Sequence, residues 1–233
     1  MKDKTLFVNE IFGSIDGEGL RTGELATFIR LNGCNLRCKY CDTMYAVEHC
    51  IGKTMTVEEI LNEVKRIGFK NITLTGGEPL IHKNVEELID VLIKNDFNVN
   101  IETNGAVDIT KYLNKPVIIT MDFKTYASGE TSKMILSNLE KLRENDCLKF
   151  VCAKEDLDLV LNILENYNVI SYIYLSPVFN KIEPAELVEF LKRNNKKINT
   201  SKMRVQIQLH KVIWDPERKG VWINLTKKNV KKQ

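Results

Sequence analysis

Three cysteines, Cys34, Cys38 and Cys41, lie close together in the stretch CNLRCKYCDT. Their spacing is C-x3-C-x2-C, and they directly follow the apolar segment ATFIRLNG, so we expect the loop that holds them at the end of a β-strand. A loop this short can surround one small object. An iron–sulfur cube usually takes four cysteine ligands, so three leave one iron open to a ligand that is not protein. The spacing therefore predicts a cluster with one open iron.

A structural zinc site is the alternative interpretation of the same cysteines. Zinc prefers a closed tetrahedral set of ligands, which would require His49 or Cys50 as the fourth. Two further cysteines, Cys147 and Cys152, lie in the apolar segment CLKFVC and are expected as small core residues. In a reducing compartment, clustered cysteines point to metal binding or catalysis before disulfides.

The stretch TGGEPL, which follows the β-branched run 72–75, is a second candidate binding segment. Gly76 and Gly77 allow the backbone to approach a ligand closely, and Glu78 can accept hydrogen bonds from an ammonium group. Taken alone, the same stretch is also typical of a tight turn before Pro79.

Three other stretches, ETNG, MDFK and LSP, also end predicted strands. In parallel β-α architectures the chemistry collects at the carboxyl ends of strands, so these ends are candidates for the same pocket. The residues that we expect to contact cofactor or substrate there are Thr103, Gly105, Lys124 and Ser176.

The elements that must position these residues alternate between short β-branched runs and segments of helical period, which predicts repeated β-α units around a parallel sheet. The predicted strands are 5–11, 26–31, 72–75, 98–102, 116–121, 147–152, 171–175 and 203–209. The predicted helices are 57–67, 85–92, 132–144, 156–166 and 184–194, with capping boxes at Thr56 and Glu59 and at Asn84 and Glu87. Because these units are too few for an eight-fold barrel, we expect an α/β fold: an incomplete, laterally open TIM-like barrel of parallel strands with outer helices.

The whole chain has 233 residues, of which 43% are hydrophobic, and a net charge of +3. We expect one domain over 1–233, with a solvated, frayed tail from about 222 to 233. The small net charge favours a small-molecule partner over nucleic acid. The absence of a long apolar run predicts no membrane span, and we expect a cytoplasmic protein.

The cysteine motif, with Tyr40 just before its last cysteine, resembles the signature of radical S-adenosylmethionine (SAM) enzymes. TGGEPL is similar to the glycine-rich strand that holds the methionine amino group in that family. The resemblance implies a [4Fe–4S] cluster on the three cysteines, whose open iron chelates SAM and whose electron splits the sulfonium to a 5′-deoxyadenosyl radical. It assigns SAM contacts to Tyr40, Gly76, Gly77 and Glu78, and we also expect SAM contacts from Asp42, Gly105, Lys124 and Ser176.

Three longer stretches, FGSIDGEG, FIRLNGCNLRCKYCDT and QLHKVIW, resemble the 7-carboxy-7-deazaguanine synthase family, over about Phe7 to Val221. The resemblance implies a carbon–nitrogen lyase of queuosine and deazapurine biosynthesis. Its reaction converts 6-carboxy-5,6,7,8-tetrahydropterin to 7-carboxy-7-deazaguanine with loss of ammonia, and SAM is regenerated. The resemblance also implies Mg²⁺, a homodimer, and an electron donor such as flavodoxin or ferredoxin.

Two residues near the cysteine loop suit a metal-bound small carboxylate. The planar donor fork of Arg30 fits a substrate carboxylate, although an ion pair at the surface is an alternative role. Thr43, directly after Asp42, offers a hard hydroxyl oxygen of the kind that Mg²⁺ accepts, or else caps the loop.

The stretch DGEG and one histidine supply further candidates. Glu18 can accept hydrogen bonds from the amino and ring N–H groups of a pterin. Asp16 stands where many members of the family carry glutamine, while Gly17 beside it allows a backbone contact. His210 is expected at the end of the last strand, where it either binds substrate or fills a structural role.

Two other functions are consistent with parts of this pattern. One is an activase that installs a glycyl radical on a protein partner, since such enzymes share the cysteine spacing. The other is a zinc-stabilised binding module without catalysis. Asp42, Thr43 and Arg30 favour a small carboxylate over a peptide, and a binding module has no use for the glycine pair.

Overall fold

The computed structural model describes residues 4–48 and 52–214. Within them, nine strands form one sheet in the order β3-β1-β2-β4-β5-β6-β7-β8-β9. Neighbouring strands are parallel from β2 onward, and β1 is antiparallel to both of its neighbours. The strand order is linear, with β3 and β9 at the two edges, so the sheet does not close on itself. The prediction of an α/β, partial barrel is confirmed.

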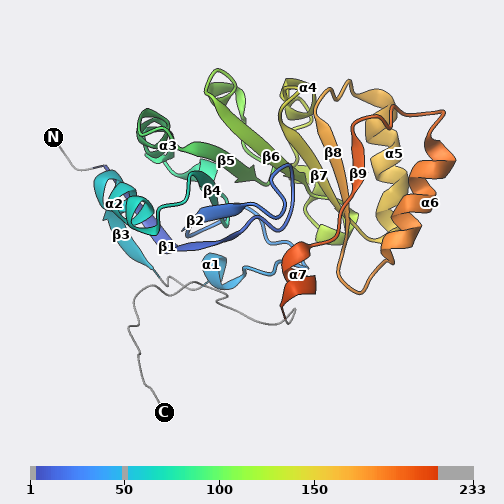
Figure 1. The fold of residues 1–233 in the computed structure, drawn as a ribbon. Coiled ribbons are helices and arrows are strands. Elements are labelled where there is room, and N and C mark those ends of the chain that lie inside the picture. Colours follow the sequence, from blue (N-terminus) through green and yellow to red (C-terminus); the bar gives the residue numbers. More distant parts are fainter. Residues whose placement is uncertain (1–3, 49–51, 215–233) are drawn as a thin grey trace, which may run out of the picture.

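The strands are β1 (Thr5–Ile15), β2 (Leu25–Leu31), β3 (Lys53–Thr56), β4 (Asn71–Gly76), β5 (Asn98–Thr103), β6 (Val117–Phe123), β7 (Cys147–Cys152), β8 (Tyr172–Pro177) and β9 (Met203–Val205). The helices are α1 (Tyr45–Glu48), α2 (Val57–Ile67), α3 (Val85–Lys94), α4 (Asn138–Lys141), α5 (Leu157–Asn166), α6 (Pro184–Asn194) and α7 (Leu209–Ile213). Figure 1 shows α2, α3, α5 and α6 along the outer side of the curved sheet, and α1 and α7 at its open side. In the part of the chain that the structure describes, no helix is long and apolar enough to cross a membrane.

The parallel strands alternate between an apolar and a polar face. Residues such as Leu74, Ile101 and Phe150 are fully buried in the core between sheet and helices. The alternate positions of β5, β6 and β7 carry polar side chains, which face the interior of the open barrel. Cys147 and Cys152 are fully buried, as predicted for core residues.

The capping box before α2 is confirmed, and the one predicted before α3 is wrong. The Glu59 backbone donates to the Thr56 hydroxyl, and the Thr56 backbone donates to the Glu59 carboxylate at 2.7 Å. Asn84 makes no side-chain capping bond, because its amide donates instead to the Thr5 carbonyl at 2.9 Å. A tertiary contact to β1 therefore replaces the local cap.

The segment 132–144 does not form the predicted long helix. It contains a single 3-10 turn at Thr131–Lys133 and the short helix α4. The Ile135 backbone donates to the Gly105 carbonyl, and the buried Asn138 amide donates to the Val107 carbonyl at 2.8 Å. The first bond uses a backbone donor that a continuous helix would need, and the second fixes the Asn138 side chain to the loop after β5.

The last predicted strand, 203–209, ends at Val205, and His210 lies in α7 instead of at a strand end. The Gln206 side chain accepts from the Gly19 backbone at 2.7 Å, and the Leu209 backbone donates to the Gly17 carbonyl. The chain therefore leaves the sheet edge to bind the loop after β1. The sequence also did not predict β3, which pairs with β1.

Candidate active site

A cavity of about 790 Å³ lies at the carboxyl ends of the parallel strands. Its lining includes most of the residues that the sequence predicted: Gly17, Glu18, Arg30, Cys34, Cys38, Tyr40, Cys41, Asp42, Thr43, Gly76, Gly77, Thr103, Lys124 and His210. Four predicted residues, Asp16, Glu78, Gly105 and Ser176, do not line it. A second cavity, of about 830 Å³, lies where strands β4, β5 and β6 begin and contains no cysteine. We therefore assign the chemistry to the first cavity.

The three cysteines of the loop after β2 lie on one wall of this cavity. Burial raises the pKa of the Cys34 thiol and raises that of Cys38 to about 11. The free energy of metal binding must therefore drive the deprotonation of these thiols. Within the described residues, no three His, Cys, Asp or Glu side chains converge closely enough to hold a single metal ion. Three thiols spread along a cavity wall fit a polynuclear iron–sulfur cluster better than one zinc ion. His49 and Cys50, the candidate fourth zinc ligands, lie outside the described residues.

The glycine pair at the end of β4 is required by the cysteine loop itself. A Cβ atom on Gly76 would lie 2.3 Å from the Leu31 carbonyl oxygen. A Cβ on Gly77 would lie 2.3 Å from the Gly33 carbonyl oxygen and 2.7 Å from the Cys34 Cβ. Any larger residue would push the loop away from the sheet, so the pair sets how closely the cysteines approach the strand ends.

Glu78, just after the glycine pair, is fully buried, and its hydrogen bonds hold the neighbouring backbone in place. Its carboxylate accepts from the Asn104 backbone at 2.6 Å, the Leu80 backbone at 2.9 Å and the Thr103 hydroxyl at 2.9 Å. Burial raises its pKa to about 7, although these bonds oppose the shift. The Asn104 amide in turn lies 3.6 Å from the Cys34 sulfur.

Arg30 forms an ion pair that is mostly buried, and its binding of a substrate carboxylate stays a prediction. It faces Glu10 across the β1-β2 pair, and its Nε donates to the Glu10 carboxylate at 2.8 Å. Tyr45 donates to the same carboxylate oxygen at 2.8 Å. Within the described residues, the terminal nitrogens of Arg30 have no hydrogen-bond partner, so they are available to a ligand carboxylate in the cavity. The Thr43 hydroxyl lies 3.7 Å from the Cys41 sulfur.

Asp16 does not point into the cavity. It is 2% exposed, pairs with Arg21 at 3.2 Å, and accepts from the Thr73 hydroxyl at 2.7 Å. Burial raises its pKa to about 6. The structure therefore gives its side chain a structural role against β4. Its neighbours Gly17 and Glu18 line the cavity.

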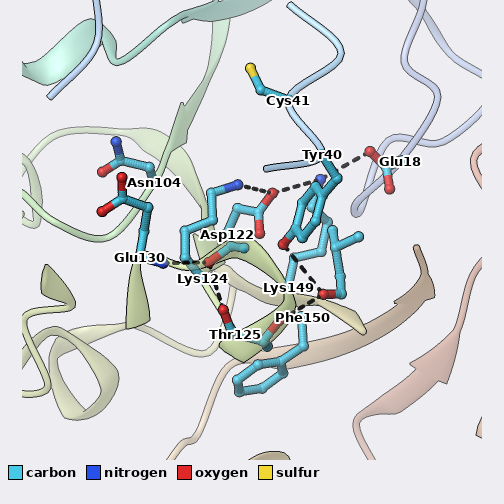
Figure 2. A network of polar contacts seen from close by, with 12 residues as sticks. Glu18, Tyr40, Cys41, Asn104, Asp122, Lys124, Thr125, Glu130, Lys149 and Phe150 are labelled. Atoms are coloured by element: carbon cyan, nitrogen blue, oxygen red, sulfur yellow. Dashed lines mark hydrogen bonds and ion pairs between the residues drawn. The ribbon is translucent and has the colours of Figure 1, made fainter. Parts of the chain in front are cut away.

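Four charged side chains form a continuous row across the cavity wall, which we call the charge ladder: Glu18, Lys149, Asp122 and Lys124 (Figure 2). The Lys149 ammonium lies 2.9 Å from Glu18 and 3.5 Å from Asp122, and Lys124 lies 2.9 Å from Asp122. Burial alone would raise the pKa of Glu18, but Lys149, with smaller contributions from His210 and Gln208, outweighs it and holds the pKa below its usual range. Burial alone would lower the pKa of Lys149, but the surrounding carboxylates raise it well above its usual range. The lowered pKa of Glu18 and the raised pKa values of Lys149 and Lys124 keep these three groups charged near neutral pH.

Tyr40 and His210 flank the charge ladder. Tyr40 packs on a small apolar cluster of Val151, Ala153 and Val178, and its hydroxyl donates to the Val151 carbonyl at 3.5 Å. The His210 ring packs on Gly17, where a Cβ would lie 2.6 Å from its Nδ1. Burial lowers the pKa of His210, which favours the neutral ring.

Ser176 and Gly105 support the wall without reaching the cavity. Ser176 is fully buried within β8. Gly105 has a φ of 76°, the left-handed conformation that favours glycine, and it packs on Met121 and Met134. Neither residue is among those that line the cavity, and their contact with a cofactor stays a prediction.

Sequence reasoning missed two members of the charge ladder, Asp122 and Lys149, and also missed Gln208, which lies 3.4 Å from Glu18. One signal was present: a lysine inside the otherwise apolar strand CLKFVC. A buried lysine requires a carboxylate partner, so that position could have been marked as part of a site. Its partner could not have been named, since Glu18 is 131 positions away.

Comparisons with known proteins agree with this geometry. The model of the radical SAM superfamily matches residues 28–191. The chain is 43% identical to a 7-carboxy-7-deazaguanine synthase of Clostridium acetobutylicum, over 92% of this chain and 98% of the relative. It is 35% identical to another from Leptospira interrogans, over 91% and 96% of the two chains.

Two solved structures share the fold. The crystal structure of QueE from Escherichia coli matches with a TM-score of 0.68 at 27% identity, over 88% of this chain and 95% of that one. A structure of TYW1 with a lysine-pyruvate adduct matches with a TM-score of 0.55 at 15% identity, over 74% of each chain.

Proposed function

The chain belongs to the 7-carboxy-7-deazaguanine synthase family of the radical SAM superfamily, and on this premise we propose that it converts 6-carboxy-5,6,7,8-tetrahydropterin to 7-carboxy-7-deazaguanine. The reaction is a carbon–nitrogen lyase step that releases ammonia. The observation that carries the proposal is one cavity whose wall joins the three cysteines, the arginine fork and the charge ladder.

The cofactor side of the cavity is the wall of the cysteine loop. Cys34, Cys38 and Cys41 would hold the [4Fe–4S] cluster, and the edge formed by Gly76 and Gly77 would receive the methionine end of SAM. When bound, the cluster and SAM supply a carbon-centred radical that removes one hydrogen atom from the substrate. The apolar strip formed by Tyr40, Val151 and Val178 offers a surface for the adenine ring.

The substrate side is formed by Glu18 and Arg30. The free oxygen of Glu18 accepts hydrogen bonds from the amino and ring N–H groups of the pterin, and the terminal nitrogens of Arg30 bind its carboxylate. Because Glu10 fixes the Nε of Arg30 at 2.8 Å, the fork is oriented before the substrate arrives. These two contacts orient the pterin between charged groups at opposite ends.

Three further features of the function are supported by the family and by single residues. Thr43, on the cavity wall beside Cys41, would ligate Mg²⁺ together with the substrate carboxylate. An electron donor such as flavodoxin or ferredoxin would reduce the cluster. The active form would be a homodimer, which light scattering of the purified protein tests directly.

The decisive experiment incubates anaerobically reconstituted protein with SAM, reductant, Mg²⁺ and carboxytetrahydropterin, and follows the product by mass. We expect the mass of 7-carboxy-7-deazaguanine and recovery of intact SAM. Cys38→Ala is the matched control, since it should lose the brown colour of the cluster and all product while the sheet remains folded. Absence of product from protein with a full cluster would refute the assignment.

A further inference from the structure

Lys149 is a buried cation on a strand that is otherwise apolar. Every residue of β7 is buried, and Lys149 itself is 7% exposed. An ammonium group in such a position is costly unless carboxylates compensate it. The contribution of Lys149 at this position is therefore its charge, which interacts with the neighbouring carboxylates, and not apolar packing.

Lys149 contacts one oxygen of each neighbouring carboxylate and leaves the other oxygen free. Its ammonium lies 2.9 Å from Glu18 Oε2 and 3.5 Å from Asp122 Oδ2. The other two oxygens, Glu18 Oε1 and Asp122 Oδ1, are buried and have no hydrogen-bond partner among the described residues. Glu18 and Asp122 both line the cavity. The lysine thus fixes the direction of each carboxylate while leaving one acceptor on each for a ligand.

We propose that Lys149 is a positioning residue, which holds the Glu18 carboxylate in the ionised form and orientation in which its free oxygen receives the pterin N–H donors. This inference rests on the proposed function, because it takes a pterin as the ligand of Glu18. In this role Lys149 acts on the substrate through Glu18.

The other groups around Glu18 do not replace Lys149. Gln208, in the segment before α7, reaches the same oxygen at 3.4 Å but carries no charge. His210 of α7 is held toward its neutral form by burial. Lys124 of β6 pairs with Asp122 at 2.9 Å, and Glu102 of β5 adds a further negative charge to the site. Without Lys149, Glu18 would be one of three carboxylates in a buried site, and protonation near neutral pH would relieve their repulsion.

The test measures binding of 6-carboxypterin, an unreactive aromatic analogue, to anaerobic holoenzyme at pH 6, 7 and 8. We expect the wild-type affinity to change little over this range. Lys149→Met should bind about tenfold more weakly at pH 8, and weaker still at pH 6 as Glu18 takes up a proton. Glu18→Gln should bind about tenfold to a hundredfold more weakly at every pH, since an amide does not titrate.

The double variant Lys149→Met with Glu18→Gln separates positioning from a general structural role. If Lys149 acts through Glu18, the double variant binds no more weakly than Glu18→Gln alone and shows no dependence on pH. Lys192→Met, which breaks an exposed ion pair on α6, is the control and should bind like wild type. If Lys149→Met does not fold, Lys149→Gln removes the charge with hydrogen-bonding capacity retained, and the same pH dependence is expected.

The inference is overturned if the Lys149 variants bind with wild-type affinity across this pH range, or if the losses of the two single variants add in full. Wild-type holoenzyme that does not bind 6-carboxypterin at all would overturn the proposed function together with this inference. Wild-type binding with unchanged Lys149 variants would overturn this inference alone.

Discussion

Two ionic networks, each with buried carboxylates, stand at opposite ends of the strands, and they differ in how completely their polar atoms are used. At the amino end, Arg143 donates to the carbonyls of Leu113, Lys115 and Val117 and pairs with Asp146 at 2.8 Å. Both Asp146 oxygens are occupied, by Arg143 and by the backbone that enters β6. At the carboxyl end, the charge ladder leaves Glu18 Oε1 and Asp122 Oδ1 without partners among the described residues.

The difference separates a network that stabilises the fold from one that serves a ligand. The hydrogen bonds of Asp146 offset the cost of its desolvation and hold the strand ends in place. A buried acceptor without a partner instead lowers the stability of the protein until a ligand binds to it. The charge ladder also lies on the cavity wall, and Asp146 does not. Stability and binding should therefore respond in opposite ways when the two networks are disrupted.

The largest effect on stability is expected from Asp146→Ala. It leaves two backbone donors without acceptors and the partly exposed Arg143 guanidinium without its carboxylate, which should lower the free energy of unfolding by about 2–4 kcal/mol. Urea unfolding of the holoenzyme measures the change. Binding of 6-carboxypterin below the unfolding transition should stay within twofold of wild type, and a large loss of binding would contradict the comparison.

A second effect depends on pH and concerns Asp16, the buried partner of Arg21. Its pKa in the folded protein is about 6, above its ordinary value of 3.8, so the folded state holds this proton more tightly than the unfolded state. The contribution of Asp16 to stability is therefore highest below about pH 4 and falls as the pH rises to about 6.

The variant Asp16→Asn lacks this titration. Relative to wild type, its free energy of unfolding should rise by on the order of 3 kcal/mol between pH 4 and pH 7. Urea unfolding at four pH values measures this difference, and a difference that is constant with pH would show that Asp16 ionises normally. Pterin binding should not change, since Asp16 does not line the cavity.

At the carboxyl end, Glu18→Gln should affect binding more than stability. Loss of a charged acceptor costs about 1.5–3 kcal/mol of hydrogen bonding, which corresponds to an affinity for 6-carboxypterin about tenfold to a hundredfold lower. The free energy of unfolding should change by less than about 1 kcal/mol, because Asp122 still neutralises Lys149. Calorimetric binding and urea unfolding of the same preparation give both numbers. Equal losses in the two measurements would remove the distinction between the networks.

The smallest effect is expected from Lys192→Met, which breaks the exposed pair between Lys192 and Glu189 on α6. Solvent screens such pairs, so the free energy of unfolding should change by less than about 0.5 kcal/mol. This variant sets the baseline against which the buried networks are compared. A change of 2 kcal/mol would mean that exposure does not predict the contribution of an ion pair in this protein.

Much of the fold could be predicted because its signals are local. Periodicity located α2, α3, α5 and α6, and the β-branched runs located the strands from β4 to β8 within a few residues. The errors fell where distant contacts outweighed local preference. Asn138 and Ile135 bond to the loop after β5, which shortened the helix expected at 132–144. Gln206 bonds to the loop after β1, which ended β9 early.

The sequence also predicted much of the site, because strand ends are recognisable from local patterns. Residues that follow strands, such as Thr103 and Lys124, line the cavity because parallel strands bring their carboxyl ends together. Ser176 and Glu78 also lie at or just after strand ends, but they are fully buried and do not line the cavity. Whether a strand-end side chain reaches the cavity depends on the side chains that pack over it, and those come from distant parts of the chain that a single sequence does not place.

The spacing of Cys34, Cys38 and Cys41 was determined by the sequence alone, because residues a few positions apart stay together in any compact loop. The pairing of Lys149 was decided only by the tertiary structure. It requires β6 beside β7 in a register that sets Lys149 opposite Asp122, and it requires the loop after β1 to fold back over them with Glu18. A buried charge is tolerated only where partners surround it, and here those partners come from strands and loops that meet after the sheet has formed.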